Sequence, residues 1–68
     1  MSDTHNRLAM QLKGLRKKRG LTQAGLARKT GLSHGYLARL EIGLHDPPLS
    51  TLERLAKALR VTVAELVE

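Results

Sequence analysis

The side chains that most often carry chemistry are few in this sequence, and their spacing does not assemble an enzyme site. Cysteine is absent, which excludes a thiol nucleophile, a thiolate metal site and a disulfide framework. His5, His34 and His45 have no metal-ligand spacing and no acid cluster beside them. We can place together no Ser-His-acid set, no phosphate-binding glycine loop and no group of acidic metal ligands. We therefore expect neither catalysis, nor a metal, nor a cofactor.

Basic side chains are abundant instead, and their distribution suggests that the chain binds a polyanion. The sequence carries 12 Lys and Arg against 6 Asp and Glu, a net charge of +6. Residues 1–40 account for a net +8 and residues 41–68 for a net −2. A basic part beside a mildly acidic part favours a face that binds nucleic acid or another acidic surface. A lopsided, solvated surface without a partner is the alternative.

Length and composition indicate one small cytoplasmic domain. The 68 residues amount to about half of a usual domain, so residues 1–68 are expected to form a single one, with residues 1–4 as a flexible tail. The hydrophobic fraction, 41%, is too high for a disordered polar chain. Tyr36 is the one aromatic residue, so the core must be aliphatic. No apolar run approaches the roughly 20 residues that span a bilayer, and no signal-peptide segment follows the polar start of the chain.

Apolar spacing and capping residues predict an all-α fold of five short helices, because strand signals are nearly absent. The first helix is expected over residues 4–18, with Asp3 or Thr4 as its cap and Gly20 after its end. The second helix is expected over residues 23–30, and the third from a cap at residue 33 to about residue 42. The fourth and fifth helices are expected to open with capping boxes at residues 50–53 and 62–65. The basic cluster at residues 16–19 fits the negative end of the first helix dipole and could add phosphate-facing charge.

The most informative segment is residues 23–42, QAGLARKTGLSHGYLARLEI, which has the pattern of two helices joined by a tight turn. Ala27 is small enough for a close helix crossing, and Gly31 allows the left-handed backbone of the turn. This segment resembles the helix-turn-helix of the lambda-repressor-like family of phage repressors, Cro proteins and related bacterial regulators. The resemblance extends to LRKKRGLTQ before it and to LEIGLHDPPLSTLERLAKALRVTVAELV after it. It implies the compact five-helix fold of that family.

The second helix of the motif is the expected recognition helix. With Leu37 and Leu40 facing inward, Gly35 and Arg39 face outward. Ser33 and His34 lie at the helix tip, which in this motif enters the major groove of DNA. We expect the tip to face base edges and Arg39 to read a guanine, with a phosphate contact or a solvated charge as the alternative for Arg39. His34 could also bind a phosphate or act as a local cap.

Other residues are expected to bind the DNA backbone. Gln23 begins the first helix of the motif, where amide groups can hold a phosphate, and the resemblance implies that use. Thr22 and Arg28 are weaker candidates. Tyr36 stands where family members often carry a hydroxyl, so its phenol could reach a phosphate; a partly buried core aromatic is the alternative.

One acidic residue is expected to have a structural role. Geometry turns Glu41 toward the interior, and a buried acid needs a partner. The resemblance implies that this partner is Arg16, which flanks the inward stripe of the first helix. We therefore expect an Arg16–Glu41 ion pair that holds the first helix against the recognition helix and places Arg16 near the DNA backbone.

Several positions depart from the family pattern. Gly25 and Gly35 stand inside helices where a glutamate and a base-reading side chain are common, and Thr30 replaces an aliphatic residue. Ile42 and Leu44 are apolar where polar residues are usual. They could contact a protein partner, a second copy of the chain or DNA sugars, or be scattered surface residues with no role.

Taken together, these patterns predict a sequence-specific regulator, most simply a repressor, of double-stranded DNA. We expect a homodimer on a palindromic operator with half-sites about 34 Å apart, in contact through the C-terminal helix with Val67. We expect no room for a separate effector domain, so the concentration of the protein itself would regulate its binding to the operator. The alternative is an antitoxin-like or other protein-interaction subunit that binds a partner through Ile42 and Leu44 and binds DNA secondarily.

Overall fold

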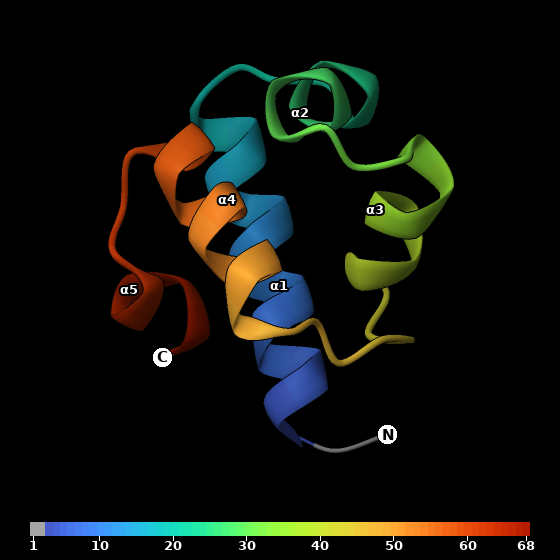
Figure 1. Cartoon of the computed structure of the whole chain (residues 1–68). Coiled ribbons are helices and arrows are strands. Elements are labelled where there is room, and N and C mark those ends of the chain that lie inside the picture. Colours follow the sequence, from blue (N-terminus) through green and yellow to red (C-terminus); the bar gives the residue numbers. More distant parts are fainter. Residues whose placement is uncertain (1–2) are drawn as a thin grey trace.

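The computed structural model describes residues 3–68, with side chains from residue 6 onward, and this part of the chain is all-helical (Figure 1). Its five helices are α1 (Asp3–Lys18), α2 (Gln23–Thr30), α3 (His34–Leu40), α4 (Leu49–Leu59) and α5 (Val63–Val67). The central pair is α1 and α4; α3 and α5 lie on opposite sides of α1 (Figure 1). The all-α class expected from the sequence is confirmed.

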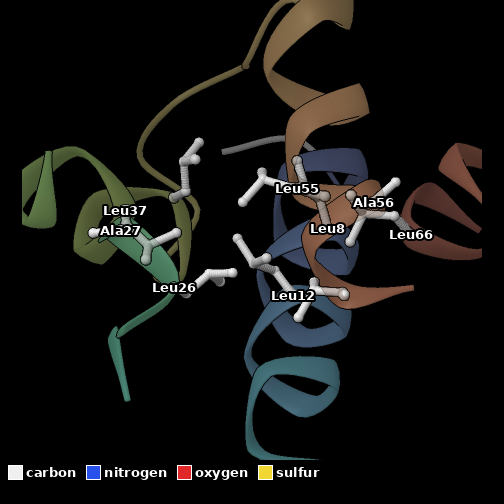
Figure 2. Close-up of a cluster of buried hydrophobic side chains, with 10 residues drawn as sticks. Leu8, Leu12, Leu26, Ala27, Leu37, Leu55, Ala56 and Leu66 are labelled. Atoms are coloured by element: carbon white, nitrogen blue, oxygen red, sulfur yellow. The ribbon is translucent and has the colours of Figure 1, made fainter. Parts of the chain in front are cut away.

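A leucine core joins the helices. Among the described residues, the largest side chains with less than 2% of their surface exposed are all leucine, namely Leu12, Leu26, Leu37, Leu40, Leu55, Leu59 and Leu66. Figure 2 shows Leu12 of α1, Leu26 of α2 and Leu55 of α4 converging between the helix pair and the helix-turn-helix segment. Burial of each such side chain contributes about 1.5–3 kcal/mol. Loss of any one would therefore destabilise the fold that positions α3.

The bounds expected for α2 are confirmed. Thr22 accepts a hydrogen bond at Oγ1 from the Gly25 amide at 2.9 Å, and Gly31 has a φ of 74° in the turn. The departure at Thr30 is explained as well, because its buried hydroxyl donates to the Leu26 carbonyl at 2.8 Å. A threonine here satisfies its own polar group within the last turn of α2.

The first helix extends to Lys18 as expected and is followed by Gly20 with a φ of 70°. It begins at Asp3, so the tail expected over residues 1–4 does not include residues 3 and 4. Residues 1 and 2, and the proposed capping side chains of Asp3 and Thr4, lie outside the described residues.

Two helix boundaries were predicted wrongly. The recognition helix ends at Leu40 rather than about residue 42, because the chain turns through Gly43 and the Leu44 amide bonds back to the Arg39 carbonyl at 3.0 Å. The fourth helix begins at Leu49 with Pro48 as its N-cap, so Ser50 is not the cap of a capping box. The Pro48 carbonyl accepts the Thr51 and Leu52 amides at 3.0 and 3.1 Å, which starts the helix before the Ser50–Glu53 pattern.

The last helix packs on α1 and α4. Thr62 caps it as expected, accepting from the Glu65 amide at 3.0 Å, and Leu66 is fully buried. In the described part of the chain, no helix has both the length and the apolar character needed to cross a membrane.

Candidate nucleic-acid interface

The α3 surface, which we define as Ser33, His34, Gly35 and Arg39, is exposed along its whole length. The buried Leu37 and Leu40 hold the opposite side of the helix against the core. Ser33 is the N-cap, since its Oγ accepts from the Tyr36 amide at 3.1 Å. Its hydroxyl hydrogen stays available to donate. A seven-residue helix is about 10 Å long, and the major groove of DNA, about 12 Å wide, admits a helix.

A buried ion pair fixes α1 to the end of α3. The Nε of Arg16 donates to Oε2 of Glu41 at 2.7 Å, and Nη2 donates to Oε1 at 3.1 Å. The Arg16 side chain is 10% exposed and that of Glu41 2%. The third nitrogen, Nη1, donates to the Leu21 carbonyl at 2.7 Å. Three of the five guanidinium hydrogens of Arg16 are thus engaged inside the protein, and one on each of Nη1 and Nη2 remains. The expected position of Arg16 near the DNA backbone stays a prediction.

The same pair affects the charge state of Arg16. The hydrogen bond to Glu41 raises the pKa of Arg16 above its ordinary value; burial opposes this rise, and the charge of Glu41 adds to it. A pKa raised by folding means that the folded state favours the charged guanidinium. This contribution is therefore present below the ordinary pKa of arginine and is lost only as pH rises through the raised value.

Gln23 extends the pair toward the tip of α3. Its Nε2 donates to Oε1 of Glu41 at 3.1 Å, and its Oε1 lies 3.1 Å from Nε2 of His34. Because an amide oxygen can only accept, His34 must donate through Nε2. The network Arg16–Glu41–Gln23–His34 thus orients the imidazole from the interior of the protein. One Gln23 amide hydrogen stays available to a ligand such as a phosphate.

Arg39 lies in a second cluster that sequence reasoning missed. Its Nε donates to Nε2 of His45 at 2.9 Å, and the His45 ring packs on the Tyr36 ring with centroids 5.3 Å apart. The sequence singled out His45 only as a rejected metal ligand. Its contact with Arg39 crosses the turn after α3, where residue spacing predicts no geometry, so no sequence signal marked it.

The remaining backbone-binding candidates are Thr22 and Arg28 at α2 and Tyr36 on α3. The hydroxyl oxygen of Thr22 is occupied as the helix cap. Arg28 is exposed. Tyr36 is half-buried and packs against the core, while also stacking on His45. The structure therefore places Thr22 and Gln23 at the start of α2 and His34 at the start of α3. Arg28 lies further along α2, and Tyr36 and Arg39 lie further along α3.

The basic residues do not all lie beside α3. Arg54, Lys57 and Arg60, the basic residues of the mildly acidic part of the chain, join Lys29 around an open groove of about 440 Å³ between α2 and α4. We call this the basic groove. Arg19, from the basic cluster at residues 16–19, is tied to the end of α4 by a 2.7 Å hydrogen bond from Nε to the Leu59 carbonyl. Net charge therefore overstates the positive charge available on the α3 surface.

Comparisons with known proteins agree with the helix-turn-helix fold. A family model described as a helix-turn-helix domain matches residues 7–68. The immunity repressor protein of Bacillus phage phi105 is 45% identical over 60 residues, which are 88% of this chain and 42% of the repressor. The chain thus spans less than half of that relative, which is a longer protein.

Solved structures share the fold. The restriction-modification controller protein C.AhdI from Aeromonas hydrophila superposes with a TM-score of 0.88 at 32% identity, covering 91% of this chain and 94% of that one. The biofilm regulator SinR, solved in complex with DNA, gives a TM-score of 0.86 at 31% identity over 90% of this chain and 98% of that one. SinR has also been solved in complex with the SinI protein, with the same TM-score and identity over 90% of this chain and 60% of that one.

Proposed function

Because the chain belongs to the helix-turn-helix family of DNA-binding transcriptional regulators, we propose that it is a sequence-specific repressor that binds a palindromic operator as a homodimer. The observation that carries this proposal is the α3 surface, where His34 and Arg39 are exposed while Leu37 and Leu40 anchor the helix. Arg39 reads a guanine through its N7 and O6 atoms, and Ser33 and His34 contact neighbouring base edges. Gly35 lets the helix backbone approach the bases.

Backbone contacts would come from the residues around that surface. The free amide hydrogen of Gln23, the backbone amides at the start of α2, the Arg28 guanidinium and the Tyr36 phenol are the proposed phosphate ligands. Thr22 contributes by capping α2 and so aiming its first amides. Such contacts set register and salt dependence, whereas the α3 surface sets sequence preference. The proposed role is binding rather than catalysis, in the cytoplasm.

Dimerisation is proposed at the side of the molecule formed by α1 and α5. Leu66 is used entirely within the protomer, and Val67 is half-buried against the core. Met10 on α1 is 76% exposed and lines an open groove beside Glu68. We therefore expect Met10→Glu to weaken a dimer without disturbing the core. Sedimentation of this variant and the wild type tests the contact, and an unchanged mass would place the dimer interface elsewhere.

A second function, a protein-interaction subunit, is favoured by one observation. Ile42, Leu44 and Leu49 are 61%, 53% and 62% exposed, and they lie close together in sequence between the end of α3 and the start of α4. Exposed apolar residues that form a contiguous patch are typical of partner-binding surfaces. If Ile42→Asp abolishes capture of a partner and leaves DNA binding intact, this function is the primary one.

The experiment that tests the proposed function is selection of bound duplexes from a random-sequence library, repeated at several salt concentrations. We expect an enriched two-fold symmetric site whose half-sites are about one helical turn, roughly 34 Å, apart. Salt-sensitive binding without any enriched sequence would contradict the proposal, because it would show a purely electrostatic surface.

A further inference from the structure

The exposed side chain of Arg39 makes a side-chain hydrogen bond at one end and lies close to the helix backbone at the other. Nε is bonded to Nε2 of His45 at 2.9 Å. At the other end, Nη1 lies 3.5 Å from the position that a Cβ would occupy on Gly35. The guanidinium therefore lies along the first turn of α3, between the turn that follows the helix and the glycine near its start. A longer side chain at residue 35 would compete for this space.

His45 is itself held in place. The turn that brings it back to α3 is closed by the Leu44 amide bonding to the Arg39 carbonyl at 3.0 Å. Its ring is half-buried and stacks on Tyr36 at a tilt of 33°. The ring thus contacts both Tyr36 and Arg39, and it must accept through Nε2 because the Nε of arginine can only donate.

This contact selects which atoms of Arg39 face outward. Arginine can bind a pair of acceptors through Nε and one terminal nitrogen, or through both terminal nitrogens. With Nε occupied by His45, only the pair Nη1 and Nη2 is available, and this pair matches the N7 and O6 acceptors of guanine. A side chain that is already oriented also loses less conformational freedom when it binds.

We propose that His45, which lies outside the helix-turn-helix, is a positioning residue for base readout: it accepts the Nε hydrogen of Arg39 so that the terminal nitrogens are presented to a guanine. The inference rests on the proposed function, because it assumes that Arg39 reads a base. His45 acts through Arg39 and makes no base contact of its own in this account.

The test compares His45→Ala with His45→Gln, whose amide oxygen is a matched acceptor at a similar reach from the backbone. The readout is the affinity ratio between the selected operator and the operator with its Arg39-dependent guanine replaced. We expect His45→Ala to lower that ratio roughly tenfold and His45→Gln to keep it within about twofold. In an Arg39→Ala background, His45→Ala should change the ratio by less than about twofold, as expected for residues that act as one unit.

Three results would overturn the inference. His45→Gln could fail to restore discrimination although the variant unfolds at the wild-type denaturant concentration. His45→Ala could lower affinity equally with and without Arg39, which would mean that His45 contacts DNA directly. The ratio could also remain unchanged in His45→Ala, which would mean that Arg39 needs no positioning.

A measurement on the protein without DNA separates this inference from the proposed function. The NMR signal of the Arg39 Nε hydrogen should shift in His45→Ala and stay near its wild-type position in His45→Gln. If the position of that signal is the same in both variants as in the wild type, the positioning contact is absent, even where duplex selection has found an operator. If the contact is present but selection enriches no sequence, the proposed function fails and base readout through Arg39 fails with it.

Discussion

The Nε of Arg16 lies 2.7 Å from Oε2 of Glu41, a bond that joins the last turn of α1 to the residue that caps the end of α3. The pair is almost completely buried. Through Gln23 it continues to His34 at the start of α3. The ion pair and its Gln23 link therefore contact both ends of the recognition helix.

The first prediction concerns this pair. Glu41→Ala leaves the Arg16 charge buried without its carboxylate partner, so we expect the free energy of unfolding to fall by about 3–5 kcal/mol. The double variant Arg16→Met with Glu41→Leu removes both charges and should lose less. Urea unfolding of the three proteins measures the difference. Equal losses in the single and double variants would contradict a stabilising role for the pairing itself.

Gln23 provides a prediction about DNA binding. Gln23→Ala removes a proposed phosphate ligand, so we expect affinity to fall by a similar factor for operator and for unrelated duplex. The slope of log affinity against log salt reports whether counterion release is otherwise retained. Should only operator binding fall, the main role of Gln23 would be to orient His34 through their 3.1 Å contact rather than to bind the backbone.

Two glycines should respond in opposite ways to the same substitution. Gly14 lies inside α1 and an added Cβ meets nothing within 4 Å. Gly14→Ala should therefore stabilise the fold by about 1 kcal/mol through helix propensity. Gly31 has a φ of 74°, so Gly31→Ala should destabilise it by about 1 kcal/mol or more. Thermal unfolding measures both, and a stabilising Gly31→Ala would show that the turn can relax to another backbone conformation.

Sequence reasoning succeeded where a signal is local. The bounds of α2 follow from Thr22 and Gly31, because a cap and a left-handed glycine each act within one turn of backbone. The start of α4 was predicted wrongly because Ser50 and Glu53 have the spacing of a capping box. Pro48, however, already provides the N-cap carbonyl with a backbone angle fixed by its ring.

Contacts that cross loops could not be predicted from spacing. Arg16–Glu41 was expected only because the resemblance implied it, and the Gln23 link to Glu41 was not expected at all. The position of His45 depends on how the turn after α3 closes, which sequence spacing does not define. The charge balance likewise predicted a basic face, but it could not show that Arg54, Lys57 and Arg60 gather in the basic groove.

The most direct test of the central claim, that the α3 surface reads DNA sequence, compares the duplexes selected by wild type, Arg39→Ala and Arg54→Ala. The last variant is a matched control, because it removes the same charge from the basic groove. We predict that Arg39→Ala costs about 1–3 kcal/mol on the operator and loses the preference at one base position per half-site. Arg54→Ala should keep every preference. The same selected sequence for all three proteins would contradict readout by Arg39.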